Sequence, residues 1–227
     1  MSAISIIIGE IYYNKDPQSS DLGKNIITAS IEMMDEMGFE QFTFKKLAEK
    51  IGSTEASIYR YFDNKLMLLL YLTTWYWAWV EYMIDFKTYH IQNTEEKLKS
   101  ILRIICHADH TLESINLPGI DIGSLRNLVI RESDKTYLTR DVDEINSQGL
   151  FRGFKALCHK VALVIEEIND QYKYPHTLVS TVLEASHQQA YFAQHLPSLT
   201  EVNKNSDIPV EEQVYDFIED SVFRLIR

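Results

Sequence analysis

The chain has 227 residues, of which 45% are hydrophobic and 24% charged, and its formal net charge of -11 comes from 22 basic and 33 acidic side chains. This composition supplies enough apolar surface for a folded core and excludes a largely disordered chain. The negative charge excludes a protein that coats nucleic acid without selectivity, because such proteins are strongly basic.

The first residues, MSAISIIIGEIYYNK, have no basic region before their short apolar run and no small-residue cleavage site after it. We therefore expect no secretory signal, and the β-branched residues favour a strand or an ordered arm over residues 1–18. Cys106 and Cys158 stand alone in apolar helical patterns, without a CxxC spacing. They predict reduced thiols in a cytoplasmic protein.

A first helix is predicted after the turn at Asp16-Pro17. Its apolar face consists of Leu22, Ile26, Ala29, Ser30, Met33 and Met37. The helix should end at Gly38, and Phe39 follows where a Schellman cap places its hydrophobic contact.

A helix-turn-helix pattern comes next. Thr43 is a candidate N-cap for a helix of about two turns. The apolar face of this second helix consists of Phe44, Leu47, Ala48 and Ile51. Gly52 then suits a left-handed backbone, and Ser53 or Thr54 caps a third helix that runs to Phe62. Two capped helices joined by a short glycine-containing turn are typical of DNA-binding hairpins.

The third helix carries small and polar side chains on the face that points away from Ile58 and Phe62. These side chains are Glu55, Ala56, Ser57, Tyr59, Arg60 and Tyr61, with Lys65 just beyond. Small residues allow close approach to base edges, whereas hydroxyl, Arg and Lys groups donate well to phosphate oxygens. The alternative is an ordinary helical hairpin that binds no nucleic acid.

The region contains Gly38-Phe39, Thr43 with Leu47-Ala48, Gly52, and Tyr59-Arg60-Tyr61-Phe62 with Lys65, in that order and without gaps. In this pattern the segment from residue 24 to residue 70 resembles the DNA-binding domain of the TetR family of bacterial transcription regulators. The resemblance implies a helix-turn-helix domain over residues 19–65 that binds double-stranded operator DNA.

The resemblance also implies roles for single residues. Phosphate contacts would come from Thr43, Tyr59, Tyr61 and Lys65, with Lys45, Lys46 and Arg60 as further basic candidates, and base edges would face Thr54, Glu55, Ala56 and Ser57. Glu55 departs from the basic or neutral residue found in many members. It either accepts a hydrogen bond from a cytosine amino group or points aside.

A long apolar helix is predicted from the cap Asn64 to about His90. Its stretch from Leu66 to Ile84 is long enough to suggest a membrane-anchored sensor. The three tryptophans of this stretch would then lie in mid-bilayer, and Glu81 would be buried in lipid. We therefore favour the buried core of a soluble domain, with no membrane partner.

Further helices are predicted over residues 66–227, which we interpret as a ligand-binding and dimerisation domain. They begin at Thr94, at Ser124, at Asp141 (running to Asn169), at Pro175 (running to His195) and near Val210. The result is an all-α fold of about nine helices.

The resemblance implies that the last two helices, over residues 175–195 and 210–227, form a homodimer. A dimer also has a physical motive, because one short recognition helix contacts few bases and a palindromic operator offers two half-sites. The alternative is that these helices only complete the core of each subunit.

The resemblance also implies a ligand pocket among the helices of residues 66–227. Candidate lining residues are Trp75, Trp79, Tyr82, Phe86, Cys106, His107, His110, His187 and Tyr191. Aromatic walls with a few polar tips suit a small effector that is largely apolar or aromatic, although such a stripe is more often a packed core. His107 and His110 suggest no third metal ligand, so we expect neither a metal nor a cofactor.

Catalytic motifs are absent from the sequence: it has no Gly-x-Ser-x-Gly elbow, phosphate-binding glycine loop or His-Glu-x-x-His. We therefore expect a regulator and not an enzyme. The prediction is a ligand-responsive DNA-binding transcriptional regulator, a repressor in its simplest form. The alternatives are the membrane-anchored sensor and an architectural DNA-binding protein without an effector.

Overall fold

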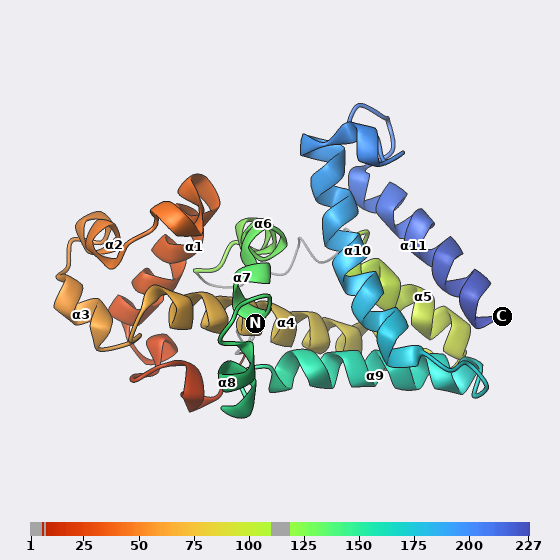
Figure 1. Ribbon diagram of the computed structural model, residues 1–227, viewed down its shortest axis with the longest axis horizontal. Coiled ribbons are helices and arrows are strands. Elements are labelled where there is room, and N and C mark those ends of the chain that lie inside the picture. Colours follow the sequence, from red (N-terminus) through yellow and green to blue (C-terminus); the bar gives the residue numbers. More distant parts are fainter. Residues whose placement is uncertain (1–5, 7, 110–118) are drawn as a thin grey trace. The chain divides into compact units, whose positions relative to one another are not determined.

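The computed structural model describes residue 6, residues 8–109 and residues 119–227, and all regular structure in these ranges is helical (Figure 1). Its α-helices are α1 (Asp21–Gln41), α2 (Phe44–Lys50), α3 (Glu55–Tyr59), α4 (Lys65–Thr88), α5 (Thr94–Ile105), α6 (Ile122–Glu132), α7 (Asp134–Tyr137), α8 (Val142–Ser147), α9 (Arg152–Ile168), α10 (Pro175–His195) and α11 (Val210–Ile226). Short 3-10 helices occur at η1 (Glu10–Tyr12), η2 (Pro17–Ser19) and η4 (Pro197–Leu199). The all-α prediction is confirmed.

The described residues form two compact units. Unit 1 consists of the residues up to Ala78 together with Gly119–Gly153, and unit 2 consists of Trp79–Asp109 together with Phe154–Arg227. Helix α4 contributes its first part to unit 1 and its last part to unit 2. Packing thus groups α6, α7 and α8 with the N-terminal helices, and the sequence-based functional division at residues 18 and 65 stays a prediction.

The core of unit 1 joins α2 and α3 to α1 and α4. Phe42, Leu47, Ile58 and Phe62 have no exposed surface. The Phe62 ring also meets the ring of Tyr71 on α4 edge-on, with 5.5 Å between centroids. Full burial of such side chains contributes about 1.5–3 kcal/mol each, so the two short helices are stabilised by this packing and not by their own length.

Helix α1 loses its helical geometry at Gly38, where φ is 78° and ψ is 158°. This ψ lies outside the left-handed helical region, so the Schellman cap expected at Gly38 does not form. Phe39 is nevertheless buried, and its N–H donates to the Glu132 side chain at 3.0 Å.

Two predicted helices differ from the structure. The long helix expected over residues 141–169 is broken into α8 and α9, because Gly149 adopts a φ of 83° that no helix interior tolerates. Helix α6 begins earlier than expected, because Asp121 and not Ser124 is its N-cap. The Asp121 carboxylate accepts the N–H groups of Gly123 and Ser124 at 3.3 and 3.2 Å.

The described part of the N-terminal arm, residue 6 and residues 8–18, belongs to unit 1 and contains 3-10 turns and no strand. Tyr12 is only 4% exposed, and its hydroxyl donates to the carbonyl of Leu150 at 2.7 Å. This burial raises the pKa of Tyr12. The backbone of Pro17 lies so close to Gly23 that a Cβ there would be 2.2 Å from the Pro17 carbonyl oxygen, which requires glycine at that position of α1.

Unit 2 packs α5, α9, α10 and α11 with the last part of α4. Helices α10 and α11 lie side by side, and α11 also packs on α5. Arg103 on α5 donates to both carboxylate oxygens of Glu212 at 3.0 Å, and its guanidinium lies 4.1 Å from the Tyr215 ring centroid. Among the helices of the described ranges, none has the apolar length needed to cross a bilayer.

Candidate nucleic-acid interface

The helices of the α2–α3 hairpin begin at side-chain caps. The Thr43 hydroxyl accepts the Lys46 N–H at 3.2 Å, and the Thr54 hydroxyl accepts the Ser57 N–H at the same distance. The hydroxyls of Thr54 and Ser57 also share a hydrogen bond of 2.8 Å. A short helix has a large share of unpaired end groups, so such caps matter most there. Helix α3 has only five residues.

The turn between the two helices is a Schellman motif. Gly52 has a φ of 64°, the Ser53 N–H donates to the Ala48 carbonyl at 2.9 Å, and the Gly52 N–H donates to Glu49 at 3.4 Å. This pair of bonds is the six-to-one and five-to-two pattern that ends a helix with a left-handed residue. The two capped helices and the glycine turn are therefore present as predicted, although α3 ends at Tyr59 and not at Phe62.

Helix α3 presents an outward surface that we call the reading face. It consists of Thr54, Glu55, Ala56, Ser57, Tyr59 and Arg60, all exposed except the half-buried Ser57. Tyr59 is 48% exposed, while one edge of its ring packs on Phe44 at 5.0 Å between centroids. This short helix therefore carries small residues, a tyrosine hydroxyl whose ring is fixed by packing, and a cation. Such a surface is suited to contact with a DNA groove and its phosphates.

The N-terminal end of α2 adds polar groups to this surface. Thr43, Lys45 and Lys46 are all exposed. The Lys46 ammonium donates to the carbonyl of Gln41 at 2.8 Å, so part of its donor capacity is already occupied. Lys45 is the freer cation of the two in the described structure.

Tyr61 does not lie on the outer face, and that prediction is wrong. It is 3% exposed, and its hydroxyl shares a 2.8 Å hydrogen bond with Ser20, the N-cap of α1. This hydrogen bond lowers the pKa of Tyr61. The helical period failed here because α3 already ends at Tyr59, so Tyr61 follows a different backbone direction.

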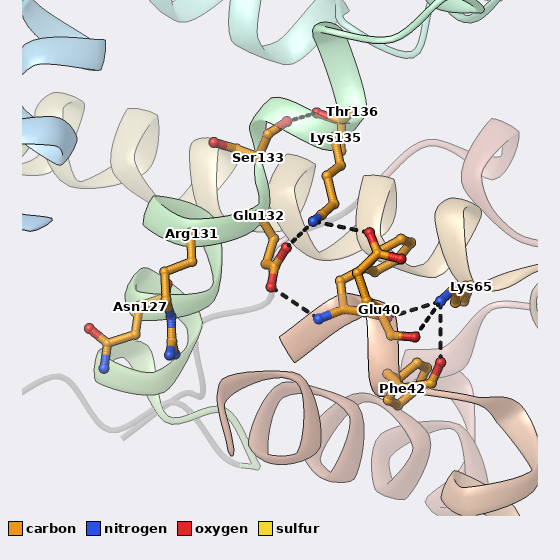
Figure 2. A network of polar contacts seen from close by, with 10 residues as sticks. Glu40, Phe42, Lys65, Asn127, Arg131, Glu132, Ser133, Lys135 and Thr136 are labelled. Carbon is orange, nitrogen blue, oxygen red and sulfur yellow. Dashed lines mark hydrogen bonds and ion pairs between the residues drawn. The ribbon is translucent and has the colours of Figure 1, made fainter. Parts of the chain in front are cut away.

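Lys65 also has partners other than DNA. Its ammonium donates to the carbonyls of Phe39, Glu40 and Phe42 at 3.0, 3.2 and 3.4 Å (Figure 2). It lies 4.4 Å from the centroid of the Phe39 ring as well. Because an ammonium group has three N–H donors, these carbonyls can account for all of them, and we do not carry the phosphate role of Lys65 forward.

The N-terminal arm brings two residues to the interface that helical periodicity could not reveal. The Asn14 N–H donates to the Tyr61 carbonyl at 2.8 Å, and its side-chain amide donates to Asp63 at 2.6 Å. Lys15, the next residue, is exposed and lies 5.1 Å from the Tyr61 ring centroid. The arm thus places a cation beside the end of α3.

The side chains predicted for a ligand pocket belong to both units, and their joint role stays a prediction. Trp75 belongs to unit 1, whereas Trp79 and Cys106 are buried in unit 2. His107 has a positive φ of 58° and stacks on Trp79 with 5.8 Å between ring centroids. A non-glycine residue in this region is uncommon, which marks this corner of unit 2 as a strained one.

The other pocket candidates have varied surroundings. His187 is buried and Tyr191 half-buried, both on α10. Tyr82 and Phe86 are 40% and 62% exposed and stack on each other, so they line no enclosed cavity. His110 lies outside the described residues.

An open groove of about 620 Å³ lies in unit 2 between α4, α5 and α9. It is lined by Ile84, Asp85, Thr88, Tyr89, Ile91, Gln92, Thr94, Lys97, Ile101, Lys160, Leu163, Val164 and Glu167, none of which was predicted as a ligand residue. Within the described part of the chain, no three His, Cys, Asp or Glu side chains are grouped closely enough to hold a metal ion.

Comparison with known proteins agrees with this geometry. Residues 26–72 match the model of the bacterial regulatory proteins of the tetR family, which covers the hairpin, most of α1 and the beginning of α4. By this match, the helix-turn-helix segment is similar to the bacterial regulators of the tetR family. No curated protein matches it by sequence.

Solved TetR-type structures share its fold at low identity. AibR in complex with isovaleryl coenzyme A and operator DNA is 13% identical, with a TM-score of 0.59 over 88% of this chain and 98% of AibR. The fatty acid degradation regulator FadR from Bacillus halodurans is 16% identical, with a TM-score of 0.59 over 95% and 96%. The TetR family regulator PfmR from Thermus thermophilus is 14% identical, with a TM-score of 0.50 over 89% and 98%.

Proposed function

We propose that this chain is a TetR-type, ligand-responsive transcriptional regulator, acting as a repressor, that binds a palindromic operator as a homodimer in the cytoplasm. The observation that carries the proposal is the capped α2–α3 hairpin with its exposed reading face. Thr54, Glu55 and Ala56 would face base edges. Thr43, Lys45 and Tyr59 would contact phosphates.

The charge of the chain supports selective binding over general binding. The whole chain carries -11, and residues 24–65 hold six basic against seven acidic side chains. Non-specific affinity for DNA and its salt dependence both grow with the number of phosphates neutralised, so both should be small here. Base contacts must then supply most of the discrimination, which gives Glu55 a defined role as an acceptor from cytosine.

Homodimerisation through α10 and α11 would bring two reading faces onto one operator. Helix α11 keeps Phe217 and Leu225 49% and 57% exposed, two helical turns apart and therefore on one side. On α10, Tyr191 and Phe192 are only half-buried. An isologous four-helix interface would cover these apolar groups, whereas water now faces them.

The effector class follows from the structural neighbours and from the side chains of unit 2. AibR is described with isovaleryl coenzyme A, and FadR regulates fatty acid degradation. Short and medium acyl-coenzyme A thioesters are therefore the first effectors to screen, followed by aromatic acids. Trp79 and His107 would be the first residues to change if such a ligand binds.

Selection of bound sequences from random duplex DNA tests the proposal directly. We expect a palindrome whose half-sites lie about one helical turn apart, with binding as a dimer. Glu55→Gln should alter the preferred base at one position in each half-site and leave the other positions unchanged. Enrichment of no sequence, with equal affinity for a polyanion competitor, would refute the proposed function.

A further inference from the structure

The 38–42 turn, which consists of the end of α1 after its kink at Gly38 and the residue before Thr43, is held by side chains from two other helices (Figure 2). Lys65 at the start of α4 bonds the carbonyls of Phe39, Glu40 and Phe42. Glu132 at the end of α6 bonds the N–H of Phe39. The backbone of this segment is therefore held by tertiary contacts from α4 and α6.

Glu132 is a buried carboxylate with a full set of partners. It is 8% exposed; its Oε1 accepts the Phe39 N–H at 3.0 Å, and its Oε2 lies 3.1 Å from the Lys135 ammonium. Lys135 also pairs with Glu40 at 3.1 Å. A buried charge is tolerated only when it is paired and hydrogen-bonded, so this arrangement strongly restrains the position of the carboxylate.

The ammonium of Lys135 keeps its positive charge in this network. Burial alone would lower the pKa of Lys135, but the carboxylates of Glu132 and Glu40 outweigh it and raise that pKa. The Lys135 ammonium thus stays charged beside the Glu132 carboxyl group. Gly38 also lies next to this carboxylate, because a Cβ at Gly38 would be 3.5 Å from the Glu132 Oε1 atom, an ordinary van der Waals contact.

We propose that Glu132 is a positioning residue for DNA binding: from the end of α6, its carboxylate fixes the Phe39 N–H and so sets where α2 begins. Thr43, the N-cap of α2, comes only four residues after Phe39. A displacement of the α6–α7 corner then reaches the reading face through one carboxylate and a five-residue turn. This inference rests on the proposed function, which makes α2 and α3 the DNA-binding helices.

Three variants separate positioning from general stability. Glu132→Ala removes the acceptor of Phe39, whereas Glu132→Gln keeps an acceptor oxygen and removes the charge. Arg131→Ala is the matched control, because Arg131 links the same two helices by pairing with Asp35 and does not touch the 38–42 turn. Operator affinity would be measured with the DNA selected above, well below the unfolding temperature of every variant.

A measurement without DNA accompanies the affinity assay. Native-state hydrogen exchange reports the opening of the Phe39 amide directly. We expect Glu132→Ala to increase exchange at Phe39 and to weaken operator binding, each by roughly tenfold, because a buried donor loses its acceptor. Glu132→Gln should keep most of the protection of the Phe39 amide and most of the operator affinity. Arg131→Ala should change operator affinity less than about twofold even if its stability falls.

The outcomes are distinct. Equal loss of operator affinity in Glu132→Ala and Arg131→Ala, at equal loss of stability, would overturn the positioning role. Unchanged exchange at Phe39 in Glu132→Ala would overturn it as well. If the unaltered protein bound no DNA at all, the proposed function would fail, while the exchange data would still decide whether Glu132 holds the turn.

Discussion

Lys65 gives the sharpest test of the structure against the sequence pattern. The family resemblance makes it a phosphate contact, whereas the structure directs its ammonium to three backbone carbonyls at 3.0, 3.2 and 3.4 Å. Lys65→Met keeps most of the apolar stem and removes these bonds. The two interpretations then differ in whether the protein is destabilised in the absence of DNA.

The expected magnitude follows from the three distances. A hydrogen bond to a charged group contributes about 1.5–3 kcal/mol, but the 3.4 Å bond is weak and the side chain is only half-buried. The interaction with the Phe39 ring adds about 0.5–1 kcal/mol, part of which methionine retains. We expect Lys65→Met to lower the free energy of unfolding by about 2–3 kcal/mol without DNA.

Urea unfolding followed by far-ultraviolet circular dichroism measures this change. Lys45→Met is the matched control, because Lys45 is exposed on the neighbouring helix. It should cost less than about 0.5 kcal/mol. For DNA binding we expect the larger effect from Lys45→Met. Loss of a phosphate contact at Lys45 should lower the slope of log DNA affinity against log salt concentration by about one. If Lys65→Met left stability unchanged and reduced only the salt slope, our structural reasoning on Lys65 would be refuted.

Three further predictions concern hydrogen bonds made by side chains. Tyr59→Phe should weaken binding to cognate and random duplexes alike, by about 1 kcal/mol, as measured by fluorescence anisotropy; a loss confined to the cognate site would contradict a phosphate contact. Tyr12→Phe leaves the Leu150 carbonyl without its donor and should lower the free energy of unfolding by about 1–2 kcal/mol, whereas an unchanged urea midpoint would mean that the arm is not anchored there. Asp121→Ala removes the N-cap of α6 and should cost about 1 kcal/mol at pH 7. Because the Ser124 hydroxyl and backbone N–H groups lower the pKa of Asp121, this stabilisation is complete above the ordinary Asp pKa and is lost as the pH falls through the lower folded value. The gap in stability between wild type and Asp121→Ala should therefore close in strong acid, and a gap that does not change with pH would contradict the cap.

Helix ends were predictable wherever the chemistry is local. Thr43, Gly52 and Thr54 act on backbone groups within four residues, and Pro175 begins α10 at the expected position. A cap or a left-handed glycine needs no distant partner, so its signal is contained in a short window of sequence. The same locality explains why the family pattern could be read without any alignment.

The predictions failed where the backbone changes direction within an apparently regular pattern. Tyr61 continues the spacing of α3 in the sequence, but the helix has already ended. Gly149 interrupts a long apolar period with a positive φ, which periodicity does not register. The aromatic stripe of α4 shows a related limit of periodicity: Trp79 and Phe86 share a face of this helix, yet one is fully buried and the other 62% exposed. Periodicity reports which residues share a face, and only packing decides whether that face is covered.

By itself the amino-acid sequence determined that the chain is helical, where its DNA-binding hairpin lies and which side chains that hairpin can turn outward. Only the tertiary structure decided which polar groups are occupied by the fold. Lys65 bonds a turn some 23 to 26 residues away, and Glu132 bonds an N–H 93 residues away. Partners so distant leave no local pattern, because their proximity arises from the packing of whole helices and not from the spacing of residues along the chain.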